Sequence, residues 1–454
     1  MKNAIIKQYS KSSLQLSMKW QAIWLTTALL CCYAVGSAAA DALPVITLEK
    51  GLKIVTEKSR VVKIAGFGES IAESDVHVAR SALLPRIDAS AGHTNLAHQP
   101  AMTFNGMAIN TSDPQHYAYS ISIQQILFDF YGSLSQYEAS RMLLEAKKID
   151  SVRIKNTVAL EFTLAFYEFL ESRHLTAAAD KEIERLDAHY RDAEQLYKAG
   201  VTTRNDLLQV QVRLSDARQK SLSLKNMEAL RAANLNNLLL RPINNPVRAE
   251  EINNPILPPS DFDLEHLWTD ASIKRAEIQI VDRTLGAIDL EEIAKKSEFL
   301  PKFYVRAAND YMENSYQLHE NNWSLTFGVN INLFEGGRSM ADLQKTRYRK
   351  NQLLEQRAKL VDDIKLELQR CTLDLHNAYA RILANQDSVD QAQENLRINK
   401  RRYEEGEGTA TEVLDAVTLL TNSETNRIRS VYDYRKAEAA THYSTGTDLL
   451  EIYK

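Results

Sequence analysis

The sequence has few of the residues that cross-link or interrupt a chain. It contains three cysteines, and Cys31 and Cys32 lie in an amino-terminal stretch that we expect to be removed, so Cys371 alone would remain. A single thiol excludes an intrachain disulfide, and its position among apolar residues at helical spacing is typical of a core cysteine. Only 15 glycines and 10 prolines occur in 454 residues, which leaves room for long, uninterrupted helices.

The chain also lacks a strong charge bias and any recognisable catalytic grouping. A formal net charge of −4 gives no basic surface of the kind that nucleic-acid binding requires. The histidines are scattered without an HExxH pattern, and no nucleophile, base and acid are grouped. Glu405-Gly406-Glu407-Gly408 is rich in glycine, but its carboxylates would repel a phosphate and no strand precedes it. We predict no enzymatic activity, no cofactor, no metal site and no nucleic-acid partner.

Long hydrophobic runs are missing except near the amino terminus. Residues 1–40 contain spaced lysines, an apolar core over residues 23–35 and the small residues 37–40. A transmembrane anchor is the alternative, but that core is too short to span a bilayer comfortably. The pattern predicts a signal peptide that is cleaved after Ala40. Lipidation is not expected, because Leu29-Leu30 precede Cys31 where a lipoprotein signal requires small residues.

A stretch of the chain occurs twice. Residues 128–200 align without a gap with residues 334–406, at a constant offset of 206, and the strand before and the turn after each copy keep this offset. Apolar residues recur at steps of three and four, as in Ile183, Leu186 and Tyr190, which is a coiled-coil-like spacing. A helix of some 65 residues would be about 100 Å long. The pattern predicts two long helices that turn at Gly200 and Gly406 and continue as returning helices.

A second duplicated stretch precedes each copy. Residues 47–84 align with residues 263–300 at an offset of 216, and each predicts one helix, the first with Thr47 as its N-cap. Leu84-Pro85 and Leu300-Pro301 end these helices and begin strands. Half of the prolines lie between the repeats. The predicted organisation is a signal peptide (1–40), a first repeat of helix, β-hairpin, long helix, turn and returning helix (41–240), a proline-rich linker (241–262) and a second repeat with a carboxy-terminal tail (263–454).

The strands that lead into the long helices alternate between bulky apolar and small polar residues. A half-buried soluble sheet is one interpretation. A membrane strand of about ten alternating residues with aromatic ends is the other, and the signal peptide favours it. The predicted lipid-facing positions are Tyr119, Ile121, Ile123, Leu325, Phe327 and Val329. Four strands cannot close a barrel, and lipid does not tolerate an open sheet edge, so at least two copies must share one barrel.

Together these motifs resemble the TolC family of outer-membrane efflux and type I secretion channels. The matching elements are the two Leu-Pro strand starts, the strand ends at residues 127–129 and 333–337, and the turns at residues 197–208 and 403–414. Each motif is weak alone, but their order, the duplication and the fixed 72-residue spacing are specific. The similarity extends from about residue 47 to residue 450.

The resemblance implies a mixed α and β membrane protein that forms a homotrimer. Each chain would give four β-strands to a shared 12-stranded barrel in the outer membrane of a Gram-negative bacterium, continued by an α-helical barrel through the periplasm. The implied function is the exit duct of a tripartite efflux pump or type I secretion system, with a periplasmic adaptor, an inner-membrane transporter and outer-membrane lipid as partners. Drugs, metals and proteins all remain possible cargoes. The alternative is a periplasmic coiled-coil adaptor or scaffold, which would have no need of alternating strands.

The resemblance also implies two kinds of site at the helical turns. The adaptor would dock on the tips, and the positions are Gly200, Val201, Thr202, Gly406, Glu407 and Gly408. The simpler interpretation is that the glycines supply a positive φ. Glu407 departs from the apolar residue that the family has there.

A resting gate would be held by a link between Tyr403 and Asp206, with acidic rings of Glu412 and Asp415. The simpler interpretation is that Asp206 and Glu412 belong to capping boxes and that Tyr403 packs in the seam. Gly408 occupies the position of the family's gating arginine, and Arg204 is a candidate replacement.

Overall fold

A computed structural model of the chain describes residues 45–252, 254–259 and 264–453. The predicted signal peptide lies outside these residues. Two compact units are present. In the smaller unit, Ile46 forms an isolated parallel bridge with Ala249, with one hydrogen bond from the Ile46 amide to the Arg248 carbonyl (2.8 Å) and one from the Glu250 amide to the Ile46 carbonyl (3.0 Å). The larger unit contains all the helices and strands described below.

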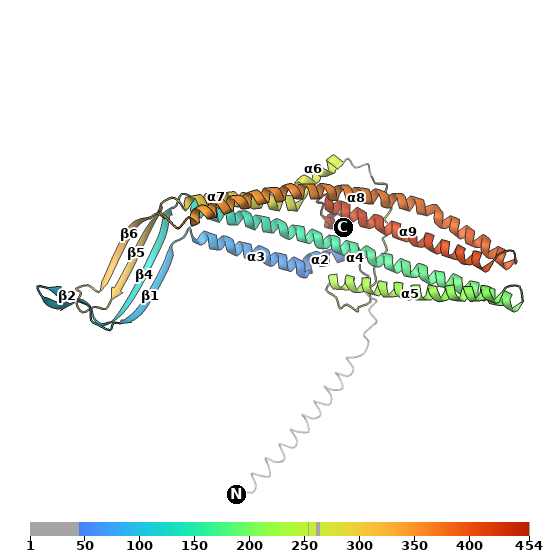
Figure 1. Cartoon of the computed structure of the whole chain (residues 1–454), viewed down its shortest axis with the longest axis horizontal. Helices are drawn as coiled ribbons and strands as arrows, with labels where there is room; N and C mark the ends of the chain where they lie inside the picture. Colours follow the sequence, from blue (N-terminus) through green and yellow to red (C-terminus); the bar gives the residue numbers. More distant parts are fainter. Residues whose placement is uncertain (1–44, 253, 260–263, 454) are drawn as a thin grey trace, which may run out of the picture. The chain divides into compact units, whose positions relative to one another are not determined.

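The helices reproduce the duplication residue by residue (Figure 1). The first repeat contains α2 (Leu48–Lys58), α3 (Arg60–Ser81), α4 (Gly132–Lys198) and α5 (Arg204–Leu238). The second contains α6 (Leu264–Lys274), α7 (Ala276–Ser297), α8 (Arg338–Glu404) and α9 (Ala410–Ser444), followed by the short α10 (Leu449–Ile452). Both long helices have 67 residues and both returning helices have 35. The offsets of 206 and 216 are therefore confirmed, and we call residues related by them twins.

The expectation of one helix over residues 47–84, and of another over 263–300, is wrong. Each is broken into two helices, at the twin positions Ser59 and Arg275. Thr47 does cap α2, since its hydroxyl accepts a hydrogen bond from the Lys50 amide (3.1 Å). Ser59 is extended and caps α3 by accepting from the Val61 amide (3.2 Å). Neither break contains the proline or glycine that would have signalled it.

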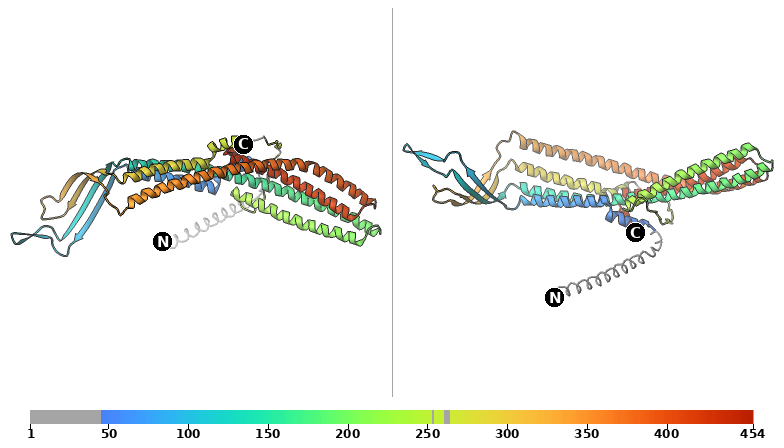
Figure 2. Two further views of the ribbon diagram at one scale, coloured as in Figure 1. Left: turned by 45° about the horizontal axis from the view of Figure 1, so that its top comes forward. Right: turned by 90° about the horizontal axis from the view of Figure 1, so that it is seen from below.

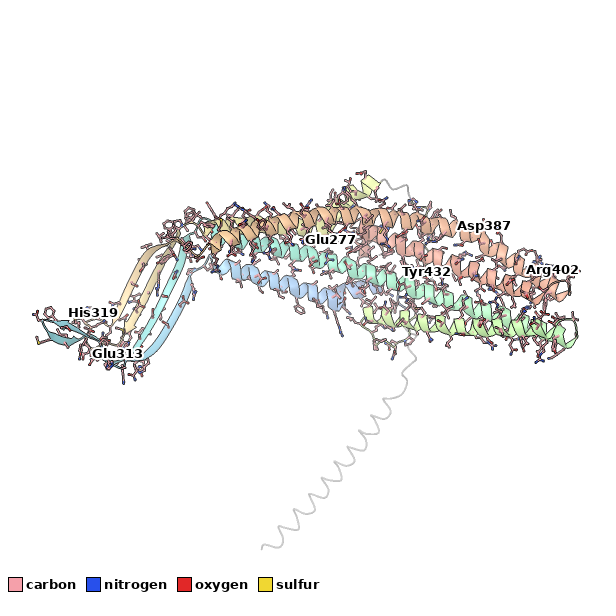
Figure 3. All side chains as sticks on the ribbon, viewed as in Figure 1. Glu277, Glu313, His319, Asp387, Arg402 and Tyr432 are labelled. Atoms are coloured by element: carbon pink, nitrogen blue, oxygen red, sulfur yellow. The ribbon has the colours of Figure 1, made fainter. Side chains whose placement is uncertain are left out.

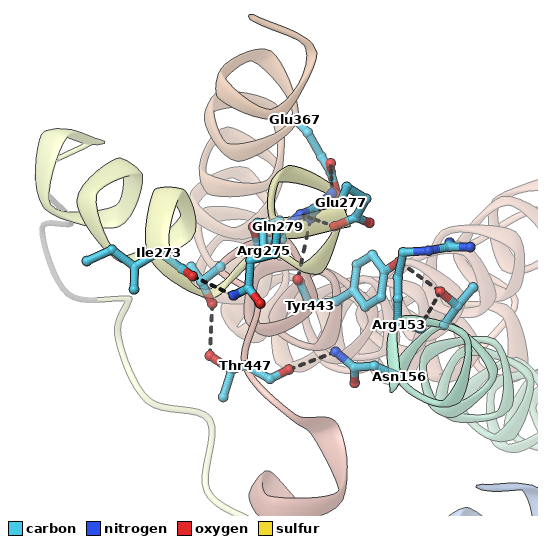
Figure 4. A network of polar contacts seen from close by, with 12 residues as sticks. Arg153, Asn156, Ile273, Arg275, Glu277, Gln279, Glu367, Tyr443 and Thr447 are labelled. Atoms are coloured by element: carbon cyan, nitrogen blue, oxygen red, sulfur yellow. Dashed lines mark hydrogen bonds and ion pairs between the residues drawn. The ribbon is translucent and has the colours of Figure 1, made fainter. Parts of the chain in front are cut away.

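Arg275 shows that tertiary contacts accompany the second break (Figure 4). Its guanidinium is buried and donates two hydrogen bonds to the Glu367 carboxylate of α8, at 3.2 and 3.0 Å. It also donates to the Ser444 carbonyl (3.2 Å) at the last turn of α9, a group that has no partner within the helix. The Arg275 guanidinium thus joins α8 to the end of α9, and both partners are distant from it in sequence.

Four strands form one antiparallel sheet in the order β1, β4, β5, β6. They are β1 (Arg86–Asn95), β4 (Gln115–Phe128), β5 (Lys302–Met312) and β6 (Asn321–Asn330). The central pair, β4 and β5, joins the two repeats. β6 ends at Asn330, three residues before the predicted end at Leu333. The first repeat's predicted β-hairpin corresponds to β1 and β4, and the chain that connects them contains a separate hairpin of β2 (Ala101–Phe104) and β3 (Met107–Asn110).

The turn of this hairpin has a local cause. Asn105 and Gly106 both have positive φ, 49° and 78°. Two central residues with positive φ match the twist of a two-residue hairpin, and Asn-Gly is its strongest sequence signal. The Asn105-Gly106 pair is thus a local sequence signal for this additional hairpin.

The helices of the larger unit run side by side, with both turns at the same end (Figure 2). α4 packs against α2, α3, α5, α7, α9 and α10, whereas α8 packs against α6, α7 and α9. α8 accordingly buries fewer than half as many residues as its twin α4. None of the helices in the described part of the chain combines the length and the apolar character that crossing a membrane requires.

Candidate functional site: the strand face and the helical tips

The sheet register places the six predicted lipid-facing residues on one face. Ile123 lies opposite Ala307, which in turn lies opposite Leu325, so both repeats contribute to the same rows. The exposed fractions of the six range from 43% for Tyr119 to 73% for Phe327. The opposite face is polar, with the Ser120 hydroxyl donating to the Asp310 carboxylate (2.5 Å). One exposed apolar face and one polar face are what a sheet between lipid and a water-filled lumen needs.

The two helical turns have the same backbone conformation. Gly200 and Gly406 each have a φ of +76°, immediately after the long helices. This left-handed conformation favours glycine, so the simpler interpretation of both residues holds. Val201 is 62% exposed beside Gly200, and it is available to a partner.

A compact apolar cluster joins the two hairpins just above the turns. The α4–α5 hairpin contributes Leu186, Ala193, Val210, Leu214 and Ala217, and the α8–α9 hairpin contributes Tyr403, Ala410, Val413, Leu414 and Val417. These residues follow the predicted seam. The tips of one chain are therefore packed on each other and do not splay apart.

Asp206 caps its own helix. Its carboxylate accepts hydrogen bonds from the Thr203 amide (3.1 Å) and the Thr203 hydroxyl (2.8 Å), and the Asp206 amide donates back to that hydroxyl, which completes a capping box. The Thr202 hydroxyl is a further donor to the same carboxylate (2.9 Å). These bonds, led by that from Thr203, hold the pKa of Asp206 below its ordinary value.

Tyr403 lies close to this carboxylate but does not contact it through a hydrogen bond. The ring is 4% exposed within the tip cluster, and burial raises the pKa of its hydroxyl. After burial, the Thr202 side chain has the next largest effect on the pKa of Tyr403, which it lowers. The Thr202 hydroxyl, however, donates its hydrogen bond to Asp206. Among the described residues, the Tyr403 hydroxyl oxygen has no hydrogen-bond partner. The predicted gate pair is thus brought to one place, with Thr202 between its members.

The second turn contains an arginine that the sequence interpretation missed. Glu412 forms a capping box with Thr409, and the Arg402 guanidinium lies 3.6 Å from the Glu412 carboxylate and donates to the Glu407 carbonyl (3.2 Å). Figure 3 labels Arg402 near the turn between α8 and α9. A Cβ at Gly408 would lie 3.1 Å from the Tyr403 amide nitrogen, so a larger residue is crowded there. The guanidinium at this turn comes from α8 itself.

Asp415 and His189 are the remaining ionisable groups of interest at the tip. Asp415 is exposed in a hollow between α5 and α9 that Arg213 and Asp216 also line. His189 is 3% exposed and meets the Tyr403 ring edge-on at 5.0 Å between centroids. Its Nε2 lies 3.3 Å from the Ala410 carbonyl at the start of α9, and burial lowers its pKa. Nothing local in the sequence marks His189, because its neighbours come from the other hairpin.

Comparison with known proteins places this fold. The family model for outer membrane efflux proteins matches residues 55–239 and 293–447. The chain belongs to this family. The alkaline protease secretion protein AprF of Pseudomonas aeruginosa is 23% identical over 389 residues, which cover 81% of this chain and 77% of AprF. The outer membrane efflux protein BepC of Brucella suis biovar 1 is 21% identical over 388 residues, 84% of this chain and 80% of BepC.

A solved structure has the same architecture. The outer membrane channel CmeC of Campylobacter jejuni superposes with a TM-score of 0.77 at 14% identity, over 88% of this chain and 85% of CmeC. The chain is thus an outer-membrane efflux protein that extends into the periplasm and serves as an exit duct of the efflux or type I secretion class. The predicted family, fold class, function class and location are confirmed, and the scaffold alternative is set aside.

Proposed function

We propose that this efflux protein works as a homotrimer, docks a periplasmic adaptor through its helical tips, and passes substrates that an inner-membrane transporter supplies. The observation that carries the proposal is the open sheet of one chain. β1 and β6 are its edge strands, and among the described residues only their inner edges are paired. Unpaired backbone groups cost several kcal/mol each in lipid, so the outer edges need partners from other copies.

The duplication predicts which strand edges of neighbouring copies meet. Within one chain, β4 of the first repeat pairs with β5 of the second. The twin of β4 is β6 and the twin of β5 is β1, so the same pairing between chains joins β6 of one copy to β1 of the next. Three copies then give twelve strands, and closure removes every edge. The outer face of that barrel would contain the six apolar positions.

The helical tips suit the docking and gating roles that the family resemblance implies. Gly200, Val201 and Thr202 form an exposed turn, and their counterparts Gly406, Glu407 and Gly408 form the other. We propose that the first turn contributes more to adaptor binding, because Val201 is apolar and exposed whereas Glu407 is charged. Asp415 would line the constriction as one carboxylate per chain, which attracts cations. Substrate passes without any bond being made or broken.

The proposed domain boundaries follow the duplication. We propose a cleaved segment of residues 1–40, repeats at 41–240 and 263–454, and a linker between them that lies against the helices. Supporting contacts run from the linker to the second repeat and to α4: the Tyr434 hydroxyl donates to the Leu257 carbonyl (2.8 Å), and His174 Nε2 lies 3.0 Å from the Glu251 carboxylate.

Two experiments test the proposal. Native mass spectrometry in detergent should give a single trimeric species, and a monodisperse monomer with intact strand content would refute the shared barrel. Cross-linking of the intact cell envelope, followed by identification of the co-purifying inner-membrane transporter, separates a drug pump, an ion pump and a secretion ATPase. Recovery of the trimer without any adaptor or transporter would refute the tripartite assembly.

A further inference from the structure

The polar face of the sheet contains an arginine that has no acidic partner. Gln124 of β4 lies opposite Arg306 of β5. Four residues along the same two strands, Ser120 lies opposite Asp310. Opposed residues of antiparallel strands project to the same face, and so do residues an even number of positions apart along one strand. Arg306 therefore shares the polar face with Ser120 and Asp310. It is exposed, and no carboxylate pairs with it in the described part of the chain.

The surroundings of Arg306 explain why its charge stays unpaired. The four nearest positions on its face are uncharged: Gln124, Thr326, Tyr304 and Ala308. Asp310 is four residues away along β5, which is about 13 Å in an extended strand and too far for an ion pair. Glu313 lies farther still, towards the end of the sheet away from the helices (Figure 3). The guanidinium is thus free to bind an anion from solvent.

The other cations on this face have acidic neighbours. Arg86 lies in the same row as Arg306, but it makes an ion pair with Asp88 at 2.9 Å. Lys302, the twin of Arg86, begins β5 and lines a hollow together with Glu335. Within the described sheet, Arg306 is therefore the cation of the polar face whose charge no neighbouring carboxylate offsets.

A closed barrel would bring three copies of this charge close to its axis. The twin of Arg306 is Ser90, so the duplication does not repeat the charge and each copy contributes one arginine. Twelve strands about 4.8 Å apart, tilted by about 40°, enclose a backbone radius of about 12 Å. A side chain that projects inward from this wall lies within about one Debye length of the axis, which is about 8 Å at physiological ionic strength. The three charges would therefore act on every ion that passes.

We propose that Arg306 of three copies forms a cationic ring inside the barrel, which binds anions and favours anionic substrates. This inference rests on the proposed trimeric barrel and adds the charge class of the substrate. A guanidinium keeps its charge at any physiological pH and binds carboxylates and phosphates through two parallel hydrogen bonds. Rings of arginine or lysine select anions in pores. Because the proposed Asp415 ring at the tips has the opposite sign, the duct would contain two selective levels in series.

Block of the reconstituted channel by inorganic tripolyphosphate in planar bilayers tests the ring. Added on the barrel side, this polyanion reaches Arg306 without passing the helical tips, so we expect stronger block from that side than from the tip side. Arg306→Gln removes three positive charges per trimer and should weaken the block about tenfold. It should also shift the reversal potential in a KCl gradient towards cation preference. Arg306→Lys keeps the charge and should retain most of the block.

Two further variants separate the ring from the general charge of the face. Arg86→Gln with Asp88→Asn removes an arginine from the same row together with its partner, so the net charge stays the same and the block should be unchanged. Thr326→Glu leaves Arg306 in place but puts a carboxylate directly opposite it, and should weaken the block as Arg306→Gln does. Native mass spectrometry should show a trimer for every variant, and the recordings are made on those trimers.

Three results would overturn the inference. One is a trimer that tripolyphosphate does not block from the barrel side. Another is equal block of the wild-type, Arg306→Gln and Thr326→Glu trimers, which would leave the proposed function intact but remove the anion site from the barrel. The third is loss of block in the variant that lacks both Arg86 and Asp88, which would place the site at that ion pair. A wild-type chain that is monomeric would instead refute the proposed function.

Discussion

Leu325, Phe327 and Val329 form a depth series on one strand. β6 has 10 residues from Asn321 to Asn330, so Leu325 lies at its middle and Val329 next to its end. All three are exposed on the apolar face, at 65%, 73% and 59%. An arginine on the lipid side of such a barrel costs roughly 2–4 kcal/mol at the bilayer midplane and about 0–1 near the interfaces. We expect Leu325→Arg to be the most costly, Phe327→Arg intermediate and Val329→Arg nearly neutral.

The cost at the midplane converts to a large change in folding. A loss of roughly 2–4 kcal/mol per chain lowers the ratio of folded to unfolded protein by about 30- to 700-fold. The assay is folding into lipid vesicles across a urea series, with the folded fraction scored by its resistance to dissociation on unheated gels. The matched control is Ser324→Arg, one residue away on the polar face and paired with Ala308. Equal midpoints for Leu325→Arg and Ser324→Arg, or no trend with depth, would refute the assignment of the faces.

Four further outcomes follow from the tip. Tyr403→Phe alone should leave single-channel conductance unchanged, since the hydroxyl has no partner in the described chain. Asp206→Ala removes the acceptor of the Thr202 and Thr203 hydrogen bonds and should raise the conductance. A higher conductance for Tyr403→Phe than for Asp206→Ala would restore Tyr403 as the link. Asp415→Ala should reduce cation preference and block by polyvalent cations in bilayer recordings; unchanged selectivity would place the constriction elsewhere. Val201→Asp should abolish adaptor cross-linking without affecting trimer formation, whereas an unaffected cross-link would move docking to the second turn. Burial lowers the pKa of His189, which has Asp192 and Lys400 as nearby charges. The unfolded chain therefore binds the proton at a higher pH than the folded chain, and the tip should lose stability as pH falls below about 6.5. His189→Gln should flatten this pH dependence in melting curves, and an equal slope in both proteins would assign the dependence to other groups.

The sequence predicts the long elements well because they depend on periodicity. The span assigned between the strand end at Phe128 and the turn at Gly200 contains α4, and the duplication transfers its bounds to α8 without error. Of the seam residues, Leu186 is buried in the tip cluster, and Ile183 and Tyr190 are partly buried against it. Helices of this length average over many apolar positions, so single exceptions do not alter the pattern.

What the sequence does not predict depends on contacts between distant residues. The break at Arg275 coincides with a guanidinium that reaches Glu367 and Ser444, 92 and 169 residues away. The burial of Tyr403 beside His189 joins two hairpins. Arg402 reaches the second turn from the end of α8, where it lies 3.6 Å from the Glu412 carboxylate and donates to the Glu407 carbonyl. Asp206 and Glu412 could be interpreted as caps from the sequence, since a capping box is a local pattern, and both are caps. Their part in gating is still a prediction.

The equal lengths of the two arms restrict how this protein can change over evolution. Inserting one residue into α4 would advance everything beyond it by about 1.5 Å and rotate it by about 100°. The tip cluster, which draws on both arms at matched heights, would then lose its register unless α8 acquired the same insertion. Length changes in the arms are therefore tolerated only in matched pairs. The connection between β1 and β4 has no such constraint, and the two twin connections do differ: the first contains the β2–β3 hairpin, whereas the one between β5 and β6 is shorter and contains no strand.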